Sequence, residues 1–264
     1  YRTDKYEQPE TDFPTDVRTM ALQGDTLWIG SLNGLYTYQL NTKKLASLDS
    51  KSNGLPHHTI YSIIRTTDNQ IYVGTYNGLC RYIEESGKFE NIPLPVNRSV
   101  SNLFVNSLLE DTSRQCIWIG MEGSLFQYTP ATGLMKPIDA FHNNSIKSLA
   151  LDGDGNLLAG TDNGLYVYQN DNGTLQHIVH DSRNIQSLTN NIIWNIFADQ
   201  EQNIWLGTDY GISLSRYNSA LQFIPISQIT GTGDGNQFYS LFRDSKGFYW
   251  FGGTNGVIRF TNPT

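Results

Sequence analysis

Short runs of alternating hydrophobic and polar residues fill the chain, and no stretch of ten residues carries the periodicity of an amphipathic helix. The clearest run is an apolar triplet closed by glycine, which recurs at steps of 44, 46, 40, 47 and 45 residues. The six copies are Leu27-Trp28-Ile29-Gly30, Ile71-Tyr72-Val73-Gly74, Ile117-Trp118-Ile119-Gly120, Leu157-Leu158-Ala159-Gly160, Ile204-Trp205-Leu206-Gly207 and Tyr249-Trp250-Phe251-Gly252. A period of roughly 40–45 residues is typical of four-stranded propeller blades. The sequence therefore predicts an all-β fold, a β-propeller of four-stranded antiparallel blades with six repeat units in one domain over residues 1–264.

Each unit shows the same order of strands and turns. A β-rich run such as residues 60–64 comes first, and a polar turn often opened by Asp leads into the triplet strand. Asn-Gly then follows in four units, at 33–34, 77–78, 163–164 and 255–256, and predicts a type I′ hairpin into the third strand. A weaker fourth strand, such as residues 44–48, completes the unit.

Closure of the propeller has two interpretations. Only four residues follow Phe260, so the sixth unit lacks its outer strand at the C-terminus. Residues 1–8 could supply that strand by folding round, or the six units belong to a seven-bladed or tandem array that leaves an open edge.

Composition excludes several classes of function. The net charge is −7 with a pI near 5.1, so nucleic acid is not an expected partner. No window of 18 apolar residues is present, so we expect no direct membrane insertion. Cys80 and Cys116 are the two cysteines, and we expect both to remain free thiols because they fall at opposite ends of their blades.

Residues with catalytic or metal-binding chemistry do not form a recognisable motif. The run Asp152–Asn156 starts like a calcium loop but lacks the glycine and the final carboxylate that such a loop requires. His57 and His58 fall between units, where we expect them to be solvated. Asp recurs at one place in the unit, at 111, 152, 199 and 244, which indicates that it builds turns. We therefore expect no catalytic residue, metal or cofactor, although a glycosidase needs only two suitably spaced carboxylates.

The repeat also shows which positions differ between units and are free for function. In the first strand a small polar column contains Thr19, Ser62 and Ser148, whereas the position before it is large and varied. Turns of the second hairpin should emerge on the same face as this varied column, near a rim suited to a ligand. The candidate ligand-binding residues are Arg18, Tyr61, Asn106, Lys147, Trp194 and Tyr239 from the column, with Tyr76, Asp162, Asp209 and Tyr210 from the turns; Asn77 and Glu122 lie in the same turns. Aromatic faces with amide, ammonium and guanidinium groups suit a sugar.

The repeated motif resembles a known family. The runs Asn203-Ile204-Trp205-Leu206-Gly207-Thr208-Asp209 and Leu27-Trp28-Ile29-Gly30, followed by Asn33-Gly34-Leu35-Tyr36, are similar to two-component regulator propeller repeats. The resemblance extends over all six units. It implies the periplasmic sensor region of a hybrid two-component histidine kinase whose parent is anchored in the inner membrane, with propellers that bind oligosaccharides from polysaccharide breakdown.

The resemblance also implies the partners. They are an oligosaccharide and further propeller and signalling modules of the same parent chain. A homodimer is an additional expectation that the resemblance does not itself imply. Two other functions remain open at this stage: a propeller glycosidase, sialidase or lyase, and a non-catalytic propeller that binds other proteins.

Overall fold

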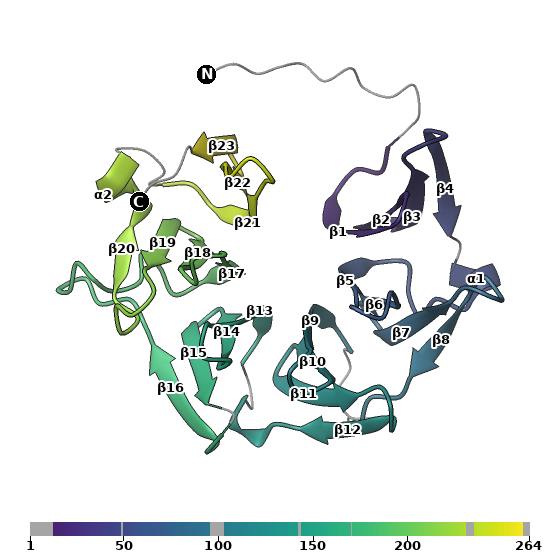
Figure 1. Cartoon of the computed structure of the whole chain (residues 1–264), viewed down its shortest axis with the longest axis horizontal. Helices are drawn as coiled ribbons and strands as arrows, with labels where there is room; N and C mark the ends of the chain where they lie inside the picture. The colour runs from purple at the N-terminus through teal and green to yellow at the C-terminus, as the bar shows by residue number, and fades with distance from the viewer. Residues whose placement is uncertain are drawn as a thin grey trace. The chain divides into compact units, whose positions relative to one another are not determined.

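Antiparallel sheets form almost the whole of the computed structural model, which describes residues 13–48, 50–95, 103–141, 144–169, 171–230 and 235–260. Five sheets have four strands and one has three, and in each sheet the strands follow chain order (Figure 1). The predicted β-propeller fold with six repeat units is therefore confirmed. Residues 1–8, which could supply a closing strand, lie outside the described residues. Contacts divide the chain into two compact units, Tyr1–Val105 and Asn106–Thr264.

The first unit holds two blades and one short helix. Its elements are β1 (Val17–Gln23), β2 (Thr26–Ser31), β3 (Gly34–Gln39) and β4 (Lys44–Leu48) in the first blade, α1 (Ser50–Asn53), and β5 (Ile60–Arg65), β6 (Ile71–Thr75), β7 (Gly78–Ile83) and β8 (Lys88–Ile92) in the second blade.

The second unit holds the remaining four blades, apart from Val105, the first residue of the third blade, which belongs to the first unit. The third blade contains β9 (Val105–Asp111), β10 (Cys116–Met121), β11 (Ser124–Thr129) and β12 (Leu134–Pro137), followed by the 3₁₀ helix η1 (Asp139–Phe141). The fourth blade contains β13 (Ile146–Leu151), β14 (Leu157–Thr161), β15 (Gly164–Gln169) and β16 (Thr174–Ile178). The fifth contains β17 (Ile193–Ala198), β18 (Ile204–Thr208), β19 (Gly211–Ser215) and β20 (Phe223–Pro225), followed by α2 (Ile226–Thr230), and the sixth contains β21 (Phe238–Arg243), β22 (Tyr249–Gly253) and β23 (Gly256–Phe260). No helix in these described segments is long and apolar enough to cross a bilayer.

The glycine that closes each apolar triplet allows adjacent blades to touch. A Cβ atom on Gly30 would lie 2.5 Å from Cγ2 of Ile60 in the next blade, and one on Gly207 would lie 2.6 Å from the carbonyl oxygen of Phe238. Both separations are too short for any side chain. The recurring glycine is therefore needed for packing between the second strand of one blade and the first strand of the next.

Tryptophan and aromatic side chains fill the space between successive blades. Trp28 meets Tyr82 edge-on with ring centroids 4.8 Å apart, and Trp205 lies 4.7 Å from Tyr249 of the following blade. Trp28 and Trp205 are buried, as is Trp118. These three residues belong to the packing between blades, as their place in the triplet predicts.

The hairpin turns differ from the predicted geometry. None of the turn asparagines at 33, 77, 163 and 255 has a positive φ, so the type I′ assignment is wrong. A Ser or Thr at the end of the second strand holds the turn instead: Oγ1 of Thr161 accepts from the amide of Asn163 and donates to the carbonyl of Gly164. Ser31, Thr75 and Thr208 make the same pair of bonds. The side chain replaces the backbone bond that a tight turn would otherwise use.

Candidate functional site

The varied column predicted to bind a ligand coincides with a β-bulge. The first strand of five blades slips register by one residue against the second strand, and each slip falls at one member of the column. These members are Arg18, Tyr61, Lys147, Trp194 and Tyr239. Bulges re-aim a side chain out of the regular ladder and are frequent next to binding sites. The bulge explains why this position varies while its neighbours do not.

Each hairpin turn contacts the segment that leads into the next blade. The amide of Gly211 donates to the carbonyl of Asn236 at 2.9 Å, and the amide of Gly164 donates to that of Asn191 at 2.7 Å. Gly78 makes the corresponding bond to Leu103 within the first unit, at 3.1 Å. The turns and the starts of the first strands therefore lie on the same rim, as the repeat predicts.

In the second unit this arrangement joins five side chains into one cluster, hereafter the Trp194 cluster: Lys147, Trp194, Asp209, Gln237 and Tyr239. The indole Nε1 of Trp194 donates to Oδ1 of Asp209 at 3.1 Å, and the amide of Gln237 donates to the same oxygen at 2.6 Å. The ring of Tyr239 meets that of Trp194 at 5.4 Å, and its hydroxyl donates to Gln237 at 2.5 Å. Nζ of Lys147 lies 4.7 Å from the Trp194 ring centroid.

The Trp194 cluster presents both apolar and polar groups to solvent. Trp194 is half-buried and Tyr239 is 41% exposed, and the adjacent turn residue Tyr210 is 55% exposed. The hydrogen bonds to Asp209 fix the plane of the indole, and the ammonium of Lys147 is attracted to its face. Such a surface offers a preordered aromatic platform together with a cation and an anion within reach of a bound hydroxyl.

A second group of stacked rings occupies the corresponding rim of the first unit. Tyr76 lies 4.0 Å from Phe104 and 4.9 Å from His57, and Tyr61 lies 5.9 Å from Phe104. His57 is stacked on His58 at 4.2 Å, and burial together with the neighbouring His58 lowers the pKa of His57. His57 is thus half-buried within an aromatic stack, which corrects the expectation that it is solvated.

Four predicted residues join neither group, and one of them is Tyr210, the exposed turn residue that follows Asp209. Arg18 is exposed at the bulge of β1, Asn106 is half-buried in β9, and Asp162 is exposed in the β14–β15 turn. Their part in ligand binding stays a prediction. Sequence reasoning missed Gln237 and Phe104 as site residues. Each lies one residue before the first strand of its blade, facing the turn of the preceding blade, and this position is the signal that could have identified them.

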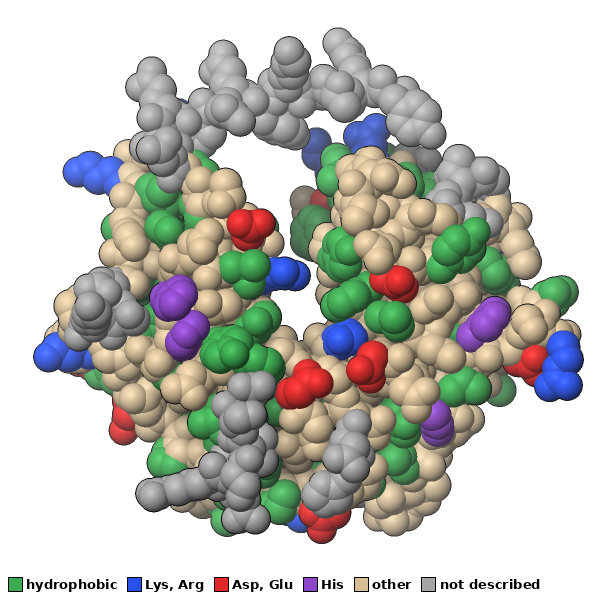
Figure 2. Space-filling model, turned by 180° about the vertical axis from the view of Figure 1, so that it is seen from behind, with side chains coloured by type: hydrophobic (Ala, Val, Ile, Leu, Met, Phe, Trp, Pro, Cys, Tyr) green, Lys and Arg blue, Asp and Glu red, His purple; other side chains and the backbone are tan. Residues whose placement is uncertain are grey.

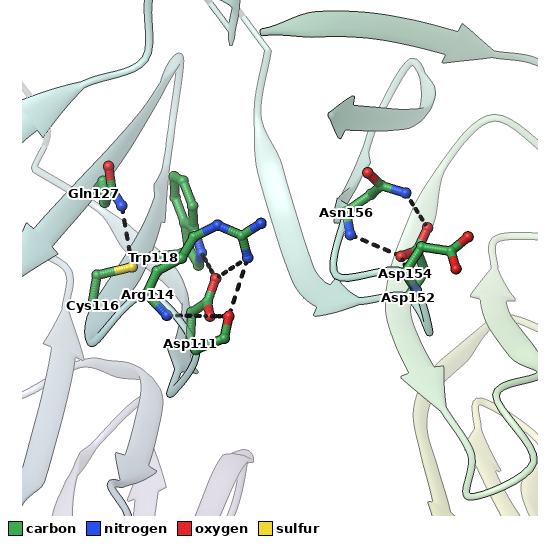
Figure 3. A network of polar contacts seen from close by, with 9 residues as sticks. Asp111, Arg114, Cys116, Trp118, Gln127, Asp152, Asp154 and Asn156 are labelled. Atoms are coloured by element: carbon green, nitrogen blue, oxygen red, sulfur yellow. Dashed lines mark hydrogen bonds and ion pairs between the residues drawn. The ribbon is translucent and has the colours of Figure 1, made fainter. Parts of the chain in front are cut away.

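The recurring aspartates build turns, as predicted, and three of them also accept hydrogen bonds from indoles, which was not predicted. Asp111 accepts from Nε1 of Trp118 and from Arg114, and Asp152 accepts from the backbone amides of Asp154 and Asn156 (Figure 3). Asp199 and Asp244 accept likewise from Trp205 and Trp250. Burial acts to raise the pKa of Asp111, but the hydrogen bonds from Ser113, Trp118 and Arg114 outweigh it and hold the pKa below its ordinary value. These carboxylates are therefore engaged in structure.

No group of three His, Cys, Asp or Glu side chains that could hold a metal occurs within the described ranges. Figure 2 shows acidic and basic side chains interspersed on the visible face of those ranges. With a net charge of −7, this distribution gives no support to a polyanionic partner.

The repeats match a known protein family. The profile of the family described as Two component regulator propeller matches residues 54–77, 187–210 and 232–255. Each match runs through a first strand and the triplet to the hairpin turn, and together they contain six of the predicted site residues: Tyr61, Tyr76, Trp194, Asp209, Tyr210 and Tyr239. The chain therefore carries two component regulator propeller repeats.

Proteins similar to this chain include the solved extracellular domain of a two component system and a curated histidine kinase. One solved structure is the extracellular domain of BT4673 from B. thetaiotaomicron, which is described as a hybrid two component system; it is 82% identical to this chain and superimposes with a TM-score of 0.79. The similarity extends over 100% of this chain and over 35% of the BT4673 structure. A curated relative, Histidine kinase P4 of Formosa agariphila, is 30% identical over 93% of this chain. The chain spans 19% of that relative's length. Virginiamycin B lyase from Staphylococcus aureus shares the fold alone. It is 17% identical, with a TM-score of 0.69, and the similarity covers 96% of this chain and 82% of the lyase.

Proposed function

We propose that this chain is part of the ligand-sensing region of a hybrid two-component sensor histidine kinase, and that it binds oligosaccharides from polysaccharide breakdown in the periplasm. The observation that carries the ligand class is the Trp194 cluster, where an indole held by Asp209 lies beside Tyr239 and under Lys147. Ring faces of this kind match the C–H face of a sugar, and the flanking ammonium, amide and carboxylate match its hydroxyls.

Two considerations favour binding over catalysis. The aspartates that recur in the blades accept hydrogen bonds from indoles and turn amides, so they are not poised as an acid and a base. The similarity to the extracellular domain of a hybrid two component system, together with the three matches to the Two component regulator propeller family, supports a role in signalling. The kinase activity itself would reside elsewhere in the parent protein.

Titration calorimetry of the purified chain against a panel of neutral and acidic oligosaccharides tests the proposal. We expect at least one saccharide to bind without being cleaved, and binding to be lost when Trp194 and Tyr239 are both replaced by alanine. Cleavage of a panel member, followed by chromatography, would favour the glycosidase or lyase alternative. Retained binding in the double variant would move the ligand away from the Trp194 cluster.

A further inference from the structure

The fifth blade departs from the repeat at its outer hairpin. In the other four-stranded blades the third and fourth strands are joined by four residues, 40–43, 84–87, 130–133 and 170–173. In the fifth blade, β19 and β20 are joined by the seven residues 216–222. Because blades of one repeat serve as controls for each other, an enlarged loop in a single blade indicates a local role beyond closing the hairpin.

The backbone of this loop is held in an unfavourable conformation. Asn218, Ala220 and Leu221 have φ values of 62°, 52° and 56°, in the left-handed region that residues other than glycine avoid. The hydroxyl of Ser219 donates to the carbonyl of Arg216 at 2.6 Å and lies 3.0 Å from the hydroxyl of Ser215, which ties the loop to the end of β19. Strain retained in this way tends to concentrate at binding sites.

The loop forms one wall of a cleft between the fourth and fifth blades. The cleft has a volume of about 510 Å³, and its other wall consists of the first turn and the outer hairpin of the fourth blade. The buried side chains of Val167 and Ile204 form the apolar part of its lining. A volume of this size is within the range of small-molecule sites.

Several polar side chains of the cleft have no partner. Within the described ranges, the side chains of Asp154, Gln176, Gln202 and Arg216 make no hydrogen bond or ion pair, although all four line the cleft. Tyr217 lines it as well and is 46% exposed. The groups on offer are thus a carboxylate, a guanidinium, two amides that both donate and accept, and an aromatic ring.

Gln202 is brought into the cleft by a close approach between the two blades. A Cβ atom on Gly153 would lie 2.3 Å from Oε1 of Gln202, so the glycine leaves the room that the amide occupies. The carboxylate of Asp152 already accepts from two backbone amides and from the side chain of Asn156. A cation would have only Asp154 as a free carboxylate, which does not suit calcium.

From these observations we infer that the cleft between the fourth and fifth blades binds an uncharged saccharide unit, with Tyr217 stacked on the ring. The carboxylate of Asp154 accepts hydrogen bonds from the sugar hydroxyls, and the guanidinium of Arg216 donates hydrogen bonds to them. The side-chain amides of Gln176 and Gln202 both donate and accept. The lining carries the carboxylates of Asp152 and Asp154 and the guanidinium of Arg216, and its formal charge of −1 does not attract an anionic ligand. This site is separate from the Trp194 cluster, since Trp194 is near the start of β17 and Gln202 follows the end of that strand.

The test uses the 264-residue chain and a fixed set of probes: glucose, galactose, mannose, xylose, N-acetylglucosamine, cellobiose and lactose. Binding is measured by titration calorimetry and by chemical shift changes of the side-chain amides of Gln176 and Gln202. We expect at least one probe to bind, and Tyr217→Ala and Arg216→Ala each to weaken that binding about tenfold or more. Phe242→Ala is the matched control, because Phe242 is an exposed aromatic residue of β21 that belongs neither to the cleft nor to the Trp194 cluster.

Melting curves of the variants should coincide with that of the wild type, since the substituted side chains are exposed. The proposal is overturned if none of the probes binds, or if a bound probe leaves the two glutamine amides unshifted. It is also overturned if Tyr217→Ala binds as the wild type does. Should binding then disappear in Trp194→Ala, the cleft is excluded as the site while the function proposed for the Trp194 cluster stands.

Discussion

The hydroxyl of Tyr249 donates a hydrogen bond to Oδ2 of Asp199 at 2.8 Å, and this bond links the sixth blade to the fifth across 50 residues of chain. The same oxygen accepts from the indole of Trp205, and the amide of Asn203 donates to it as well. Burial, followed by the bond to Asp199, raises the pKa of Tyr249. One carboxylate thus closes a turn, fixes an indole and connects two blades.

Replacing Tyr249 by phenylalanine should lower the free energy of unfolding by about 2 kcal/mol, because the ring is kept while a buried hydrogen bond to a charged group is lost. Urea denaturation measures the change. Tyr210→Phe, which removes an exposed hydroxyl, is the control and should leave the midpoint unchanged. Equal midpoints for the two variants would show that the bond between Tyr249 and Asp199 adds no stability.

The lowered pKa of Asp111 predicts a loss of stability in acid. A carboxyl whose pKa is lower in the folded state stabilises the fold above its unfolded pKa of about 3.9, and this contribution is lost as the pH falls below that value. Asp111→Asn should therefore be less stable than the wild type at pH 7 and should lose less stability between pH 5 and pH 2. Thermal melts across this range measure both slopes, and parallel curves for the two proteins would contradict the assignment.

Both thiols should react only after unfolding. Cys80 and Cys116 are free and buried, and burial raises the pKa of each, so little thiolate forms near neutral pH. Mass spectrometry after iodoacetamide treatment should show almost no alkylation of the native protein. In denaturant without reductant it should show two additions per chain, and a chain that needs reductant to reach two additions would contain a disulfide.

Gly207→Ala should destabilise the chain by about 1–3 kcal/mol, because the added methyl group would collide with the backbone of Phe238 in the next blade. Gly133→Asn is the control. Gly133 has a φ of 70° with open space around it, and asparagine tolerates that conformation. If both variants unfold at the same denaturant concentration, the triplet glycine is not required for packing between blades.

The blades could be predicted from sequence because glycine, the apolar triplet and the turn aspartate recur with one period. Comparing equivalent positions of the six units also identified Trp194 and Tyr239 as varied positions, although it could not show the β-bulge that redirects their side chains. The predicted type I′ turn geometry was wrong because the Asn-Gly pair was interpreted alone. In the structure the hydroxyl of Thr161, two residues before Asn163, holds the turn. Gln237 was missed because its contact with Asp209 joins residues from two blades, so that its position directly before a first strand was the only signal within its own unit.

The last prediction separates a tryptophan of the ligand rim from one of the packing between blades. Trp194 is half-buried, and its indole contacts Asp209, Tyr239 and Lys147 at the rim. Trp205 is fully buried against the sixth blade. Trp194→Ala should weaken oligosaccharide binding by about 2 kcal/mol, roughly thirtyfold, because stacking on the indole provides most of the apolar contact. Its melting temperature should stay close to that of the wild type.

Trp205→Ala should instead lower the free energy of unfolding by about 3–5 kcal/mol, since the substitution leaves a large cavity and removes a hydrogen bond to the buried Asp199. Calorimetric titration with the oligosaccharide panel and a melting curve for each variant provide both readouts. If Trp194→Ala melts as early as Trp205→Ala, the indole of Trp194 is part of the packing between blades. A Trp194→Ala chain that keeps both its melting temperature and its affinity would place the ligand on other residues.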